Sequence, residues 1–118
     1  MKMTPEDREI ISRIVNLSLI AIDAKMLVSL NFKPGSNIYE NGYRLGQEAR
    51  SSGNRPIYLF SKLKASLRQN NQILVQVSIK EKNKFGHELF NKTIVAKSAD
   101  ELLNTLESEL SSLELDKL

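Results

Sequence analysis

The sequence predicts an α+β fold: amino-terminal helices, an antiparallel sheet of two or three strands, and a carboxy-terminal helix packed on the sheet. Three patterns support this class. Apolar residues recur at helical spacing after a capped start at Thr4. Apolar and polar residues alternate over residues 73–80, as in a half-buried strand. A capping box begins at Ser98 and leads into a stripe of leucines.

The first helix is predicted to begin at Thr4, with Pro5 at its first position and acidic residues in its first turn. Residues 17–30 are apolar nearly all round, so we expect the helix to continue to a turn at Pro34 and Gly35. A helix of this kind is usually buried on more than one side. In so short a chain the second side can be covered by another copy, which predicts a homodimer.

A second helix is predicted over residues 37–51, with Ser36 as its cap. Gly42 and Gly46 would share one face of this helix, where another backbone can approach closely. Residues 56–69 fit a strand and a helix equally well, because their apolar residues match both periods and Pro56 suits a first helical position. The sequence leaves that choice open.

The strand over residues 73–80 is predicted to form a hairpin with a return strand over residues 87–97, through a turn at residues 83–86. The closing helix follows the capping box, in which the Ser98 hydroxyl and the Glu101 carboxylate satisfy backbone donors. We expect the 118 residues to form one domain, with a helical part over residues 1–52 and the sheet and closing helix over residues 55–118. The predicted core consists of Ile14, Ile73, Val75, Val77, Leu102, Leu106 and Leu110.

The composition argues against most catalytic chemistry. The chain has no cysteine and one histidine, which excludes disulfides, zinc–cysteine sites and multi-histidine metal sites. His87 follows a predicted turn and is expected to be a bystander, and the paired acids lie at helix starts or on a solvated face. We therefore expect a non-enzymatic protein that uses no cofactor and no metal.

The amino-terminal region predicts a soluble, cytoplasmic protein without a membrane segment. The charged residues 6–9 stand where a secretory signal would have its apolar core. The most apolar run, residues 14–22, is too short to span a bilayer and is interrupted by Asn16 and Ser18.

Charge is segregated along the chain. Residues 50–97 carry ten basic and two acidic side chains, whereas residues 98–118 carry one basic and six acidic side chains. A basic surface with neighbouring aromatic rings can hold phosphates and stack on bases, which predicts DNA or RNA binding by a basic sheet and hairpin surface. The predicted contacts are Arg50, Arg55, Tyr58, Phe60, Lys62, Lys64, Arg68, Lys80, Lys82, Lys84 and Lys92.

The two interpretations of residues 56–69 give two element orders. As a helix before a hairpin, the segment resembles a winged helix-turn-helix with the hairpin as its wing. As a strand, it gives residues 37–115 the order helix, three strands, helix, which is similar to double-stranded-RNA-binding domains. Both resemblances concern element order alone.

The alternative function is a protein-interaction module, either a homo-oligomeric adaptor or an inhibitor of a larger protein. The apolar first helix would supply the contact between copies. Glu107, Glu109 and Glu114 on the closing helix would face a basic partner.

Overall fold

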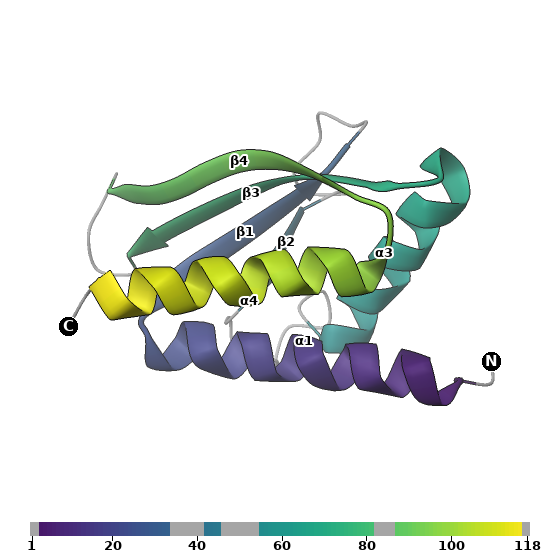
Figure 1. Cartoon of the computed structure of the whole chain (residues 1–118), viewed down its shortest axis with the longest axis horizontal. Helices are drawn as coiled ribbons and strands as arrows, with labels where there is room; N and C mark the ends of the chain where they lie inside the picture. Colours follow the sequence, from purple (N-terminus) through teal and green to yellow (C-terminus); the bar gives the residue numbers. More distant parts are fainter. Residues whose placement is uncertain (1–2, 34–41, 46–54, 82–86, 117–118) are drawn as a thin grey trace.

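The computed structural model describes residues 3–33, 42–45, 55–81 and 87–116. Within them the chain forms three helices and four strands, in the α+β class predicted from the sequence (Figure 1). The sheet has four strands rather than two or three. In chain order the elements are α1 (Pro5–Asp23), β1 (Met26–Phe32), β2 (Gly42–Leu45), α3 (Pro56–Asn70), β3 (Ile73–Glu81), β4 (Glu88–Ala96) and α4 (Ala99–Asp116).

The sheet has the strand order β2-β1-β3-β4, and every neighbouring pair is antiparallel. The three helices pack on one face of it: α1 lies against β1 and β2, α3 against β3, and α4 against β4. Figure 1 shows the two long helices, α1 and α4, running side by side along the sheet. The result is a two-layer domain, in which the helices cover one face of the sheet and the other face is turned away from them.

The core lies between these two layers. Alternate residues of β1 and β3 point into it, and the register sets Val28 opposite Ile79 and Leu30 opposite Val77. Burying such side chains is the main favourable contribution to folding, worth about 1.5–3 kcal/mol each. The predicted core is confirmed, because all seven residues named from the sequence are buried here: Ile14, Ile73, Val75, Val77, Leu102, Leu106 and Leu110.

The first helix is shorter than predicted. It ends at Asp23 instead of continuing to Pro34 and Gly35, which lie outside the described residues. Ala24 caps it with an N–H to the Ile20 carbonyl at 2.9 Å, and Lys25 adopts the left-handed conformation at φ 56°. The apolar run that suggested a longer helix is strand β1, which pairs with β2 on one side and β3 on the other.

The second predicted helix is contradicted where the structure describes it. Gly42–Leu45 form strand β2, which pairs with residues 28–31 of β1. Tyr43 and Leu45 are buried, so this short edge strand extends the core. The remaining residues of the predicted helix, Gly46 among them, lie outside the described part of the chain.

Residues 56–69 are helical, which settles the choice that the sequence left open. Pro56 occupies the first position of α3, and Asn71 ends the helix in the left-handed conformation at φ 57°. The double-stranded-RNA-binding order, which needed a strand here, is therefore wrong. The winged-helix interpretation is also wrong, because the β3–β4 pair belongs to the main sheet instead of forming a separate wing.

The two predicted helix starts are confirmed. The Thr4 hydroxyl accepts a hydrogen bond from the Asp7 N–H at 3.1 Å, and the Asp7 carboxylate accepts one from the Thr4 N–H at 3.2 Å. The Ser98 hydroxyl accepts from the Glu101 N–H at 3.1 Å, while the Glu101 carboxylate reaches the Lys97 N–H at 3.1 Å. These bonds fix the positions at which α1 and α4 enter the helical layer.

Candidate functional site

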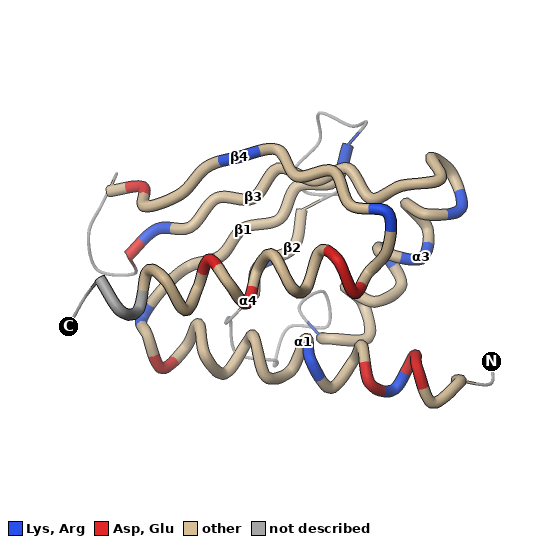
Figure 2. The backbone as a smooth tube through the Cα atoms, in the orientation of Figure 1, with Lys and Arg blue, Asp and Glu red and all other residues tan. Residues whose placement is uncertain are grey.

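The predicted nucleic-acid contacts do not form one surface. Figure 2 shows the basic positions spread over α3, β3 and β4. Lys80 follows inward-facing Ile79 and so lies on the outer sheet face, whereas Lys92 pairs with Val77 and lies on the inner face. The predicted basic sheet and hairpin surface is thus divided between two sides of the sheet. Three of the predicted contacts, Arg50, Lys82 and Lys84, lie outside the described residues.

The outer sheet face carries a polar network centred on a carboxylate. Glu88 accepts hydrogen bonds from the Ser78 hydroxyl at 2.7 Å and from the Asn91 amide at 3.0 Å, and Gln76 donates to Asn91 at 3.1 Å. The bond from Ser78, followed by the bond from Asn91, lowers the pKa of Glu88 below its usual 4.5. A carboxylate held in its charged form makes this part of the face unsuited to a polyanion.

Lys92 lies in an unusual place for a binding residue. It shares the inner side of edge strand β4 with Phe90 and Ile94, and its ammonium lies 5.5 Å from the centre of the Phe90 ring. Its side chain is exposed, so the stem covers apolar surface while the charge reaches water.

One flank of α3 faces α1 and is occupied by contacts within the chain. The Lys64 ammonium lies 3.3 Å from the Asp7 carboxylate, and it also lies 5.5 Å from the centre of the Phe60 ring. Phe60 is 5% exposed and cannot offer its ring to a base. The pKa of Asp7 is lowered, mainly by the Thr4 N–H and further by Lys64. Phe60 is therefore a core residue, and Lys64, whose side chain is 56% exposed, contributes an ion pair to the α1–α3 contact.

The other flank of α3 brings predicted contacts together. Tyr58 and Lys62 are four residues apart and share a helix face, with the Lys62 ammonium 5.0 Å from the centre of the Tyr58 ring. The Tyr58 ring stacks on Tyr43 of β2, with the ring centres 6.3 Å apart, and the residue Tyr58 as a whole is 38% exposed. Lys62 also lies 6.0 Å from the ring of Phe32, the last residue of β1.

A pocket continues this flank toward the end of β1. It has a volume of about 170 Å³, and we call it the α3–β1 pocket. Its lining includes two lysines and two residues with side-chain amides, and none of the lining residues that the structure describes is acidic. Its chemistry suits an anionic or strongly accepting group. The pocket is lined by Phe32, Lys33, Lys62, Ala65, Ser66, Gln69 and Asn70.

The sequence predicted part of this pocket. Lys62 was predicted as a contact, with Tyr58 on the same helix and Arg55 at its N-cap, but Lys33, Gln69 and Asn70 were not. Lys33 directly follows strand β1, which the sequence had placed inside a long helix. No local pattern joins Lys33 to a segment some thirty residues later, because that contact depends on the sheet pairing.

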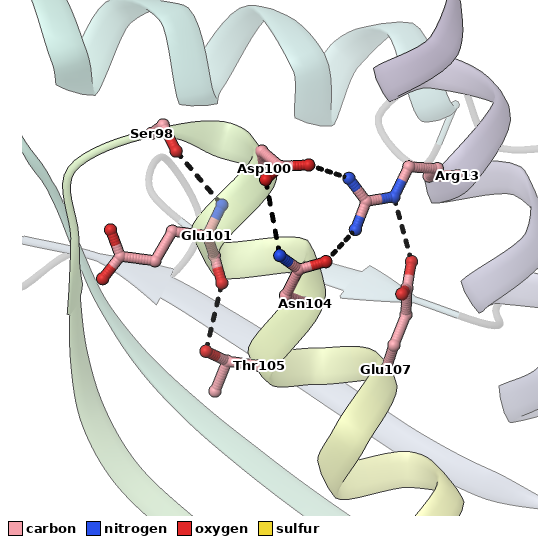
Figure 3. A network of polar contacts seen from close by, with 7 residues as sticks. All are labelled: Arg13, Ser98, Asp100, Glu101, Asn104, Thr105 and Glu107. Carbon is pink, nitrogen blue, oxygen red and sulfur yellow. Dashed lines mark hydrogen bonds and ion pairs between the residues drawn. The ribbon is translucent and has the colours of Figure 1, made fainter.

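A second polar cluster joins α1 to α4 (Figure 3). Arg13, whose side chain is 18% exposed, donates to Glu107 from Nε at 3.1 Å, to Asn104 from Nη2 at 2.6 Å, and to Asp100 from Nη1. These acids, Glu107 first, raise the pKa of Arg13. The acidic surface predicted at Glu107, Glu109 and Glu114 is thus partly used inside the chain, since Glu107 is bound to Arg13. Glu109 is half-buried, and the side chain of Glu114 lies outside the described part.

Within the described ranges, no three His, Asp or Glu side chains are grouped so that they can hold a metal ion. His87 is exposed just before β4. None of the described helices is long and apolar enough to cross a membrane.

Comparison with known proteins found no matching family model, no similar curated protein and no similar solved structure. The chemistry of the α3–β1 pocket and of the exposed surfaces is therefore the basis for inferring a function.

Proposed function

We propose that the chain is a non-enzymatic nucleic-acid-binding module that holds a single strand along the outer flank of α3 and in the α3–β1 pocket. One observation carries the proposal: Lys33 and Lys62 line the same pocket, and Tyr58, one turn before Lys62, is 38% exposed. The chain contains no acidic residue from Arg50 to Lys80, so α3 brings no negative charge of its own to this flank.

The pocket and the ring would serve different parts of a nucleotide chain. A pocket of about 170 Å³ is smaller than most ligand sites and fits a phosphate group better than a whole nucleoside. Lysines that replace the counterions of a phosphate supply binding that does not depend on sequence. The exposed part of Tyr58 would offer a surface on which a base stacks. Arg55 lies seven residues before Lys62, roughly 10 Å along the helix, and would meet a further phosphate.

A single strand fits this arrangement better than a duplex. The opposite flank of α3 packs on α1, where Lys64 forms an ion pair with Asp7. The helix therefore cannot enter the groove of a duplex with basic residues on all of its sides. Cations beside an exposed aromatic ring are typical of single-strand binding. We place this role in the cytoplasm, in keeping with a chain that has no cysteine.

Fluorescence anisotropy with labelled oligonucleotides of about twelve nucleotides tests the proposal. Oligo-uridine, oligo-thymidine and a duplex of the same length are titrated at several salt concentrations. We expect the single strands to bind more tightly than the duplex, with affinity falling steeply as salt rises. The double variant Lys33→Gln and Lys62→Gln should lose roughly tenfold in affinity, and its salt slope should fall by about 1.4, since each phosphate contact in a single strand contributes about 0.7.

The matched control is the double variant Lys80→Gln and Lys97→Gln, which removes the same charge outside the pocket. Its affinity should change by less than about threefold, because general charge alone acts weakly at a distance in salt. Equal losses in the two double variants, or no binding by the wild type at the lowest salt, would overturn the proposal.

A second candidate function, a protein-interaction module, is favoured by a different observation. Val15, Leu19 and Ile22 on α1 are each exposed by more than a third although they are large and apolar. This surface is separate from the α3–β1 pocket.

A further inference from the structure

The exposed apolar residues of α1 form one stripe. Ile11, Val15, Leu19 and Ile22 follow one another at intervals of four, four and three residues, which places them in a line along the helix. Val15 is 39% exposed, Leu19 is 53% exposed and Ile22 is 44% exposed, while Ile11 is half-buried at the edge of the core. We call these four residues the α1 ridge. The buried side of the same helix carries Ile14, Leu17 and Ala21.

We propose that the α1 ridge is the contact surface of a two-fold homodimer, in which α1 packs antiparallel against α1 of a second copy. This inference does not rest on the proposed nucleic-acid role, because it concerns a different helix. It is carried by the symmetry of the ridge and by the charges at its ends.

Three of the four ridge residues, Ile11, Val15 and Leu19, are symmetric about Val15, whereas the counterpart of Ile22 is Arg8. Ile11 lies four residues before Val15 and Leu19 four residues after it, while Arg8 and Ile22 lie seven residues before and after it. A two-fold axis through Val15 would therefore pair Val15 with itself and Ile11 with Leu19 of the second copy. A surface that matches itself under a two-fold rotation is what an isologous dimer requires.

The charges at the two ends select the antiparallel direction. Arg8 is exposed near the start of the ridge and Asp23 is exposed at its end, and neither forms an ion pair with another described residue. In the antiparallel pair each Arg8 would lie beside Asp23 of the second copy. In a parallel pair, like charges would meet at both ends, which is unfavourable.

The position of Asp23 is electrostatically unfavourable within a single chain. It is the last residue of α1, where the helix dipole is negative, and no basic residue lies in that last turn. A salt bridge to Arg8 of a second copy would offset this cost. The neighbouring Ser18 hydroxyl donates to the Ile14 carbonyl at 3.0 Å, so burying Ser18 beside the ridge would leave no donor unsatisfied.

The size of the ridge sets the expected strength. A standard stable interface buries about 800 Å² on each partner, and one helical stripe in each copy offers less. We therefore expect a reversible dimer whose population rises with protein concentration.

Sedimentation velocity over a range of concentrations tests the proposal. We expect the wild type to move from a 13.4 kDa particle toward twice that mass as concentration rises. Leu19→Lys should weaken the dimer by at least about tenfold, because it places a charge beside the centre of the apolar contact. Val95→Lys is the matched control, since Val95 is also 53% exposed but lies on β4, away from the ridge. Circular dichroism should show native helix content for both variants, because each changed side chain is already exposed.

A charge exchange tests the antiparallel direction. Arg8→Asp should weaken the dimer by setting two carboxylates against each other, and the double variant Arg8→Asp with Asp23→Arg should restore it. Both changes improve the match between the side chains and the dipole of α1, so a weaker dimer cannot be ascribed to a weaker helix.

Three outcomes would overturn the proposal. The first is a wild-type protein that stays at 13.4 kDa at the highest concentration. The second is a dimer that Val95→Lys disrupts as strongly as Leu19→Lys. The third is a double charge variant no stronger than Arg8→Asp alone, which would exclude the antiparallel pair.

Discussion

The two faces of the sheet share the same strands but differ in almost every other respect. On β3 the inward-facing Val77 and Ile79 are fully buried under the helices, while their neighbours Gln76 and Ser78 lie on the outer face and bond to β4 side chains. The inner face gains its stability from apolar burial, and the outer face gains little beyond exposed hydrogen bonds. Adjacent residues of one strand therefore contribute very differently to folding.

The largest expected effect comes from comparing two neighbours on β3. Ile79→Ala removes a fully buried side chain and should lower the free energy of unfolding by about 2–5 kcal/mol. Ser78→Ala removes one exposed hydrogen bond and should lower it by less than about 1 kcal/mol. Urea denaturation of both variants measures the difference. Equal losses would show that the outer face is as important to stability as the core.

A smaller effect is expected from titration on the inner face. Burial raises the pKa of Tyr43 to about 12, so folding favours its neutral form. The resulting stability is fully present below pH 10, the ordinary tyrosine value, and should be lost as pH rises from 10 toward 12. Urea midpoints measured across this range should fall more steeply for the wild type than for Tyr43→Phe. Parallel curves would contradict the assignment to Tyr43.

The smallest effect is expected from titration on the outer face. The pKa of Glu88 is lowered by Ser78 and Asn91, so folding favours its charged form. This contribution is present above pH 4.5 and should be lost as pH falls through the lower folded value. An NMR titration of the Glu88 carboxyl carbon should show its pKa rising in Ser78→Ala. Thr93→Ala, an exposed change on the same face, should leave it unchanged.

Local signals explain which elements the sequence predicted. The alternation in β3 and the helix starts at Thr4 and Ser98 depend on a few consecutive residues, and the structure confirms them. The end of α1 lacks such a signal, because a lysine at position 25 adopts the left-handed conformation that glycine or asparagine usually takes. Asn71 does the same at the end of α3 and is the kind of residue that marks such an end. Because no residue that usually ends a helix stands at position 25, the sequence does not separate strand β1 from the apolar run that begins in α1.

The residues of the candidate site likewise divide into those that local sequence predicted and those that it did not. Tyr58 and Lys62 were predicted because their charge and aromatic character can be seen along one segment. Lys33 lies beside them because β1 pairs with β3 and α3 packs next to it. Its part in the site therefore depends on tertiary structure and cannot be predicted from one segment of sequence. The spread of Lys80 and Lys92 over opposite faces likewise follows from strand register, which net charge does not encode.

Lys92 also affects how the protein can aggregate at high concentration. Strand β4 is an edge, and an unpaired edge is a template on which a foreign strand can add. An incoming strand that extended the apolar layer past Phe90 and Ile94 would trap an ammonium group away from water, at a large energetic cost. Lys92 therefore disfavours fibril-like strand addition at this edge. Contact between helices is then the way in which copies of the chain can associate with a lower risk of aggregation.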